Sequence, residues 1–161
     1  MSPLRLTAAA ILATGVAAGE ISKYGAFLTP ISGTDSKVFG EVYIEVSEDG
    51  KVTARGAAGH LEPSLSVKGG DCTAKNGCGV HIHAGDSCAD ATSQGGHFFS
   101  TDSDPWGNVV YDHTDAKGSA AWKFDVDIER SDVDGKAFIV HGNDGGRVAC
   151  GILASKHLPG F

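Results

Sequence analysis

Every second residue between positions 120 and 128 is apolar, and this alternation restricts the fold more than any other feature of the chain. The apolar set is Ala120, Trp122, Phe124, Val126 and Ile128. Successive side chains of a β-strand point to opposite faces of a sheet, so this pattern predicts a strand with one buried face. Residues 38–46 repeat the period, and a turn at Glu48–Asp49–Gly50 leads into a third predicted strand over residues 51–56.

No helical pattern competes with these strands. After residue 18 no stretch sustains helical periodicity, and 23 glycines punctuate the sequence. Residues 62–71 and 97–107 are rich in turn-forming residues, so both segments are expected to be loops. A length of 161 residues with 41% hydrophobic content suits one domain with a sizeable core. We therefore expect an all-β domain, an antiparallel sandwich or flattened barrel.

The first 18 residues differ in character from the rest. Residues 1–5 include Arg5 and form a short basic region, residues 6–18 are mostly apolar, and Val16, Ala17 and Ala18 supply small residues for cleavage. This pattern predicts a secretory signal peptide over residues 1–18 and a mature domain over 19–161. A retained membrane anchor is the alternative, although the apolar run is short for spanning a bilayer. The predicted location is secreted or at the cell surface.

The chain is acidic, with a formal net charge of −7. Cleavage after Ala18 would remove Arg5 and leave 12 basic against 20 acidic residues, a net charge of −8. An acidic chain without a basic run is unsuited to nucleic acid or to anionic membranes. We expect neither as a partner once the signal peptide is removed.

Four cysteines remain after cleavage, and an even number in an exported chain favours disulfides. Their spacing suggests Cys72–Cys78 as a local clasp and Cys88–Cys150 as a long-range bridge, although four cysteines allow three connectivities. Loop entropy alone would stabilise the fold by roughly 2.4 and 4.3 kcal/mol respectively, as upper figures. A zinc site of cysteines and histidines is the rival interpretation, but the spacings fit no known zinc-finger pattern.

Three histidines lie close together in the sequence. His81 and His83 alternate within a predicted strand over residues 79–83, so their side chains would share one face, and His97 follows two glycines that permit a close backbone approach. Neutral imidazoles bind copper, zinc, iron or nickel, so the ligands alone do not name the metal. The alternative is a pair of half-exposed strand histidines without a ligand.

A fourth histidine, His141, ends an apolar segment over residues 136–141. A glycine-rich loop over residues 142–146 then leads to Arg147, three residues before Cys150. Taken alone, His141 could simply be bonded to a backbone carbonyl. The other histidines, His60, His113 and His157, are expected to be surface or capping residues.

Taken in order, these motifs resemble the landmarks of the copper-zinc superoxide dismutase family. The likeness spans roughly residues 26–153 and is carried by His81-Ile-His83, Gly95-Gly96-His97, Trp106-Gly-Asn-Val, Val140-His141 and Gly146-Arg147-Val-Ala-Cys150-Gly. The resemblance implies a Greek-key β-barrel of about eight antiparallel strands. It also implies copper ligands at His81, His83, His97 and His141, a Cys88–Cys150 disulfide, and an Arg147 that holds the superoxide anion.

Two departures from the family pattern change the expected metal content. Nine residues separate His97 from Gly107, and none is a histidine, so the zinc site of the two-metal enzymes is missing. The loop that guides superoxide in the family is cut to residues 142–146. Both losses resemble the copper-only, secreted branch, in which an acidic side chain replaces zinc as partner of the bridging histidine. Asp102 and Asp104 are the candidates here, and either could instead be a solvated loop carboxylate.

The sequence therefore predicts an exported copper-dependent superoxide dismutase without zinc. Its substrate would be superoxide, which it converts to dioxygen and hydrogen peroxide, with Arg147 and His97 as catalytic residues. The alternative is a related domain that binds copper or keeps the scaffold without turnover. A structural site that binds only zinc is a third interpretation, and the sequence predicts no oligomeric state.

Overall fold

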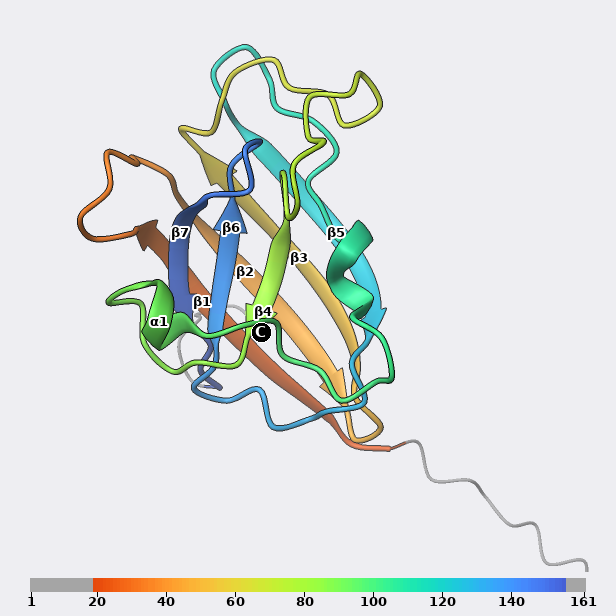
Figure 1. Ribbon diagram of the computed structural model, residues 1–161. Helices are drawn as coiled ribbons and strands as arrows, with labels where there is room; N and C mark the ends of the chain where they lie inside the picture. Colours follow the sequence, from red (N-terminus) through yellow and green to blue (C-terminus); the bar gives the residue numbers. More distant parts are fainter. Residues whose placement is uncertain (1–18, 156–161) are drawn as a thin grey trace, which may run out of the picture.

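The computed structural model describes residues 19–155, which form seven strands and two one-turn helices (Figure 1). The strands are β1 (Ile21–Pro30), β2 (Phe39–Ser47), β3 (Lys51–Gly59), β4 (Val80–His83), β5 (Ala120–Asp127), β6 (Ala137–His141) and β7 (Arg147–Ile152). The helices are α1 (Ala91–Gln94) and the 3-10 turn η1 (Pro105–Asn108). The predicted signal peptide and His157 lie outside the described residues.

All strand pairs are antiparallel, and their order is β4-β6-β7-β1-β2-β3-β5. Strand β1 joins the two parts of this curled half-barrel, because it pairs with β2 along most of its length and with β7 through Thr29 and Pro30. In Figure 1 the short strands β4, β6 and β7 cross in front of the long ones. The connections from β3 to β4 and from β4 back to β5 run between opposite ends of the strand order. Strands make up nearly all of the regular structure in the described chain, so the predicted all-β fold is confirmed.

The core lies between the short and the long strands. The predicted inward residues of β2 are almost fully buried, namely Val42, Ile44 and Val46. In β5 the indole of Trp122 stacks on the ring of Phe138 from β6, with 6.5 Å between the ring centroids. Phe124 is only half-buried and packs at the margin of the core, where its ring makes an edge contact with the indole of Trp106 from η1. The period-two pattern therefore predicted the core-facing side of both strands.

Both expected disulfides are present. Cys72 and Cys78 close a short loop before β4, and Cys88 is joined to Cys150 of β7, with Cα–Cα distances of 5.7 and 5.6 Å. No cysteine is free in the described chain, which contains all four, so the rival cysteine–histidine zinc site is wrong. Within residues 19–155 no helix has the length and apolar character needed to cross a membrane.

Candidate metal centre

His81 and His83 come from the strand that was expected to carry them. On β4, Val80 and Ile82 face the core, so the two histidines project from the opposite face of the strand. That face is covered as well, and both histidines are only 1% exposed. The interpretation as half-exposed strand histidines is therefore wrong. Hydrogen-bonded pairing with β6 places His81 opposite Ile139, which fixes the register of the site.

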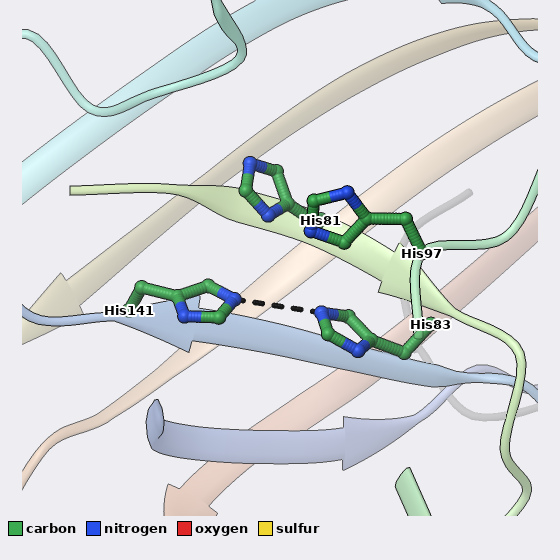
Figure 2. Close-up of side chains that lie close together, drawn as sticks. All are labelled: His81, His83, His97 and His141. Carbon is green, nitrogen blue, oxygen red and sulfur yellow. Dashed lines mark hydrogen bonds between the residues drawn. The ribbon is translucent and has the colours of Figure 1, made fainter. Parts of the chain in front are cut away.

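His97 and His141 complete a cluster of four imidazoles (Figure 2). His141 ends β6 at a bulge, and its backbone N–H donates to the carbonyl of Gly79 over 2.8 Å. His97 forms an isolated bridge with His83, which draws the loop after α1 onto the end of β4. One nitrogen of each ring lies within 4.8 Å of one nitrogen of every other ring. In residues 19–155 this is the one group of three or more side chains suited to a metal ion.

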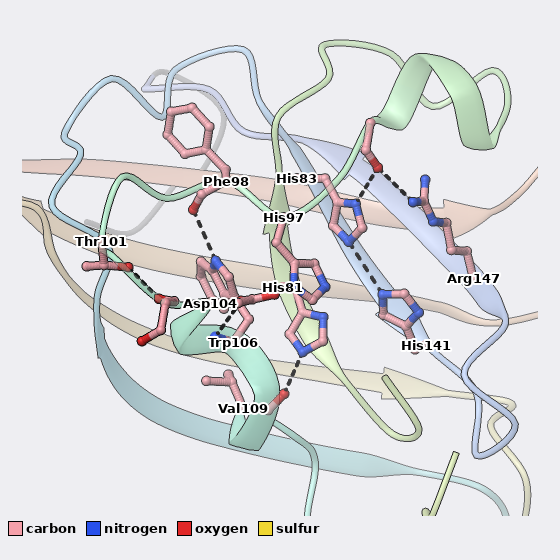
Figure 3. Close-up of polar contacts among 12 residues, drawn as sticks. His81, His83, His97, Phe98, Thr101, Asp104, Trp106, Val109, His141 and Arg147 are labelled. Carbon is pink, nitrogen blue, oxygen red and sulfur yellow. Dashed lines mark hydrogen bonds and ion pairs between the residues drawn. The ribbon is translucent and has the colours of Figure 1, made fainter. Parts of the chain in front are cut away.

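Backbone carbonyls hold the outer nitrogens of three rings. His81 Nε2 lies 3.0 Å from the oxygen of Val109, and His83 Nδ1 lies 3.0 Å from that of Gly95. His141 Nδ1 lies 2.9 Å from the oxygen of Gly145. A carbonyl can only accept, so each of these nitrogens carries the proton of a neutral ring. The other nitrogen of each ring then offers a lone pair to the centre of the cluster (Figure 3).

The inward nitrogens fit a bound cation. His81 Nδ1 and His97 Nε2 are buried without a hydrogen-bond partner. The Nε2 atoms of His83 and His141 are 3.4 Å apart, although neither has a proton to share when the outer nitrogens carry them. Buried polar atoms without a partner are costly, and a metal ion would satisfy all four lone pairs at once. The donor set of four imidazoles suits copper, zinc, iron or nickel.

Burial keeps the strand histidines neutral. Burial as the main cause, with the neighbouring imidazoles as a smaller one, lowers the pKa of His81 to about 2. Burial also lowers the pKa of His83 to about 3 and that of His141 to about 4, against the opposing effect of their carbonyl partners. Metal ligation requires the unprotonated ring, so these three residues are ready to bind a cation at neutral pH.

The remaining ring, His97, is held by a carboxylate. Its Nδ1 donates to Oδ2 of Asp104 over 2.7 Å, and Oδ1 of the same carboxylate accepts from the backbone N–H of Trp106 over 2.9 Å. Asp104 thereby also caps η1. Asp102 is exposed and makes no hydrogen bond or ion pair within the described chain. Of the two candidates that the sequence left open, the structure therefore brings only Asp104 to His97.

Arg147 begins β7, and its guanidinium reaches α1. Nη1 donates to the carbonyl of Ala91 and to Oε1 of Gln94, both over 2.9 Å, and Nη2 donates to the carbonyl of Gly95 over 2.7 Å. The Gly95 oxygen therefore binds both Arg147 and the metal-site residue His83 (Figure 3). Burial lowers the pKa of Arg147 from its ordinary value, yet a guanidinium stays charged in proteins.

Several supporting residues could not be found from the motifs alone. Gln94 is fully buried beside Arg147, and Tyr111 donates its hydroxyl to the carbonyl of His141 over 3.0 Å. Asp90 caps α1 through the backbone N–H of Ser93, and this short-range pattern was the only sequence signal for the turn. The described histidines outside the cluster, His60 and His113, are exposed as expected.

Comparisons with known proteins extend the likeness to the fold. Neither a protein-family model nor a curated protein matches the chain. Among solved structures, the clock protein EA4 is 23% identical with a TM-score of 0.56, and the match covers 83% of this chain and 94% of that one. The Cu(II) structure of Candida albicans superoxide dismutase 5 is 15% identical with a TM-score of 0.54, over 86% and 95% of the two chains.

A mutant of the same Candida enzyme is 17% identical with a TM-score of 0.54, over 87% of this chain and 96% of that one. The class of protein is thus defined at the level of architecture: the chain has the superoxide dismutase fold. On that fold it carries a buried cluster of four histidines that can hold a metal ion.

Proposed function

We propose that this protein is an exported, copper-dependent superoxide dismutase of the copper-only type. One observation carries the proposal: four imidazole nitrogens lie close together, and the Arg147 guanidinium lies beside this cluster. The Gly95 carbonyl accepts hydrogen bonds from both His83 and Arg147. Two disulfides support export, since such bonds persist in oxidising compartments. Residues 1–18 would direct secretion and be removed.

Copper is the metal that this donor set favours. It is the strongest divalent binder of the first-row series at nitrogen sites. His81, His83, His97 and His141 would hold it, and when bound it would supply one-electron exchange between its Cu(II) and Cu(I) states. Two superoxide anions and two protons then give one dioxygen and one hydrogen peroxide. The chain's own residues must bind the anion and deliver protons.

Arg147 is proposed to bind the superoxide anion. Its guanidinium has no carboxylate partner within residues 19–155, so its positive charge is uncompensated there. A charge-assisted hydrogen bond can hold an anionic diatomic molecule. The acidic surface repels superoxide at long range, so this local cation matters and the reaction rate should depend on salt.

His97 is proposed to carry a proton at Nε2. Asp104 accepts from Nδ1, so a protonated ring would be stabilised by the carboxylate beside it. The three other rings have neutral carbonyl partners and lack this compensation. His97 is therefore the ligand best suited to take up a proton and return it to the reduced oxygen species.

The test is a comparison of Arg147→Ala with Arg55→Ala, a control on β3 that removes the same charge. The purified protein should contain close to one copper and no stoichiometric zinc. Arg147→Ala should leave the copper content nearly unchanged while lowering the superoxide decay rate roughly ten- to a hundredfold, the worth of a charged hydrogen bond. Arg147→Lys should retain more activity because it keeps the charge.

Each alternative has its own outcome in this experiment. A copper-loaded protein that does not accelerate superoxide decay would establish the copper-binding or scaffold domain instead. Zinc in place of copper would favour the structural zinc site. Loss of copper from Arg147→Ala would make the residue structural, and full activity in that variant would remove it from the mechanism.

A further inference from the structure

Gln94 is a buried polar residue to which no catalytic or metal-binding role has been assigned above. It is the last residue of α1 and its exposed fraction is 0%. Its Oε1 accepts a hydrogen bond from Nη1 of Arg147 over 2.9 Å, while its Nε2 is buried without a partner in the described chain. A buried amide that leaves a donor unsatisfied costs free energy, and the hydrogen bond to Arg147 is the one side-chain contact of Gln94 in the described chain that offsets it.

The chain holds Gln94 in place through its backbone. The carbonyl of Gln94 accepts from the N–H of Gly85 over 2.9 Å, so α1 lies against the segment that follows β4. A Cβ at Gly85 would lie 1.8 Å from the oxygen of Ser93, which leaves no room for any side chain there. The Cys88–Cys150 disulfide ties the same segment to β7, the strand that begins with Arg147. Gln94 and Arg147 are thus fixed relative to each other.

The acceptors around Arg147 share one property, which is that none is charged. They are the carbonyls of Ala91 and Gly95 and the amide of Gln94. Neutral acceptors orient a guanidinium without cancelling its charge, whereas a carboxylate at the same place would form an ion pair. Gln94 supplies the one side-chain acceptor of the three, so it is the position at which a substitution can change this balance.

We propose that Gln94 is a positioning residue for the anion site: it aims the Arg147 guanidinium and, because its side chain is neutral, leaves the positive charge available to a small anion. This inference rests on the proposed function. Two substitutions at residue 94 separate the effect of charge from the effect of geometry. Gln94→Glu keeps an oxygen acceptor in a side chain of nearly the same shape and adds a negative charge. Gln94→Met keeps the length and removes the acceptor.

The experiment is a titration of the copper-loaded protein with azide, followed by the Cu(II) absorption and electron paramagnetic resonance spectra. Gln94→Glu should weaken azide binding by about tenfold or more, and Gln94→Met by about threefold. The copper content and the azide-free spectrum should match those of the parent protein. Thr92→Ala, an exposed position on the same turn, should leave azide binding unchanged.

Equal azide affinity in the parent, Gln94→Glu and Gln94→Met proteins would overturn the proposal. If both variants weaken azide binding equally, the neutral charge of Gln94 does not matter, and only its role in orienting Arg147 is retained. A changed azide-free spectrum would make Gln94 a support of the copper ligands instead. If Gln94→Met does not fold, Gln94→Ala replaces it.

Azide binding requires no turnover, so the proposed function and this inference can fail separately. A parent protein that does not accelerate superoxide decay but follows the azide pattern would refute the dismutase and keep the role of Gln94. If the parent accelerates superoxide decay but the Gln94 variants bind azide as tightly as the parent, the dismutase is supported and the role of Gln94 is refuted.

Discussion

The two halves of the candidate metal centre are built differently. His81, His83 and His141 stand on the paired strands β4 and β6, are 1% exposed, and are each anchored by a backbone carbonyl. His97 stands on a loop, its side chain is 9% exposed, and it is anchored by Asp104, whose own side chain is 45% exposed. We call these the strand half and the loop half.

The difference separates binding from proton chemistry. Ladder hydrogen bonds hold the backbone of the strand histidines and carbonyls hold their rings, so the strand half offers a preformed site whose rings stay neutral. In the loop half, the partner of His97 is a charged side chain that can respond to the charge of the ring. A site with one adaptable ligand among three fixed ones suits a metal whose ligand preference changes with its redox state.

Removing one ligand from each half should give the largest effect. His83→Ala deletes a strand ligand that also contacts His141 and Gly95, so copper affinity should fall by more than a hundredfold, beyond the usual effect of losing a supporting contact. Activity should be abolished. His97→Ala should lose activity too but keep more copper, because the strand half remains intact. Metal analysis after dialysis and a superoxide decay assay measure both.

His113→Ala is the matched control, since that histidine is exposed and separate from the cluster. It should keep both copper and activity. Equal copper loss from the two ligand variants would erase the distinction between the halves, and equal loss from all three would mean that the centre lies elsewhere.

The second-largest effect should be a loss of stability when the metal-free protein is acidified, because of the strand half. The unfolded chain takes up protons at its histidines below about pH 6.5, while the folded chain keeps His81, His83 and His141 neutral because burial lowers their pKa. Stability is therefore full above pH 6.5 and is lost as the pH falls toward about 4, where His141 begins to protonate in the fold. At pH 5.5 the loss should be on the order of 4 kcal/mol for the three.

Urea unfolding of the metal-free protein between pH 7.5 and 5 measures this loss. His81→Gln should show a shallower dependence on pH, since it removes one of the titrating groups. His113→Gln, at an exposed position, should not. A free energy of unfolding that is flat over this range would mean that the strand histidines are not held neutral by the fold.

The sequence predicted the strand half better than the loop half, and the reason is physical. A period of two fixes which residues share a face, so the inward residues of β2 and β5 and the pair His81 and His83 followed from spacing alone. The full burial of that pair did not follow, because it depends on how the loop that carries His97 folds back against the end of the strand, which the period does not encode.

Contacts across loops carry no such period. The choice between Asp102 and Asp104 depended on the turn at η1, where capping directs one carboxylate inward. Gln94 had no signal, because its partner Arg147 lies 53 positions further along the chain. Strand β1 was also missed: its central residues alternate poorly, and Ala26 and Leu28 are buried through pairing with β2.

The smallest expected effect tests the contact that defines the loop half. Asp104→Asn should lower the superoxide decay rate about tenfold, the lower range for losing a residue that orients a metal ligand. Asp104 uses a separate oxygen for each of its two contacts, whereas the amide has only one, which can accept from His97 Nδ1 while the cap of the one-turn helix η1 is lost. The copper content should then change little. The lower rate should come mainly from the missing negative charge beside His97, since the single amide oxygen can still hold the ring through Nδ1.

Asp102→Asn provides the matched control. It removes the same charge at a position two residues earlier, and the Asp102 carboxylate makes no contact within the described chain. Its decay rate should equal that of the parent. If the two variants are equally active, the charge of Asp104 does not assist His97, and the loop half only holds the ring in place. If Asp104→Asn also releases copper, its carboxylate positions the ligand as the strand carbonyls do, and the two halves act alike.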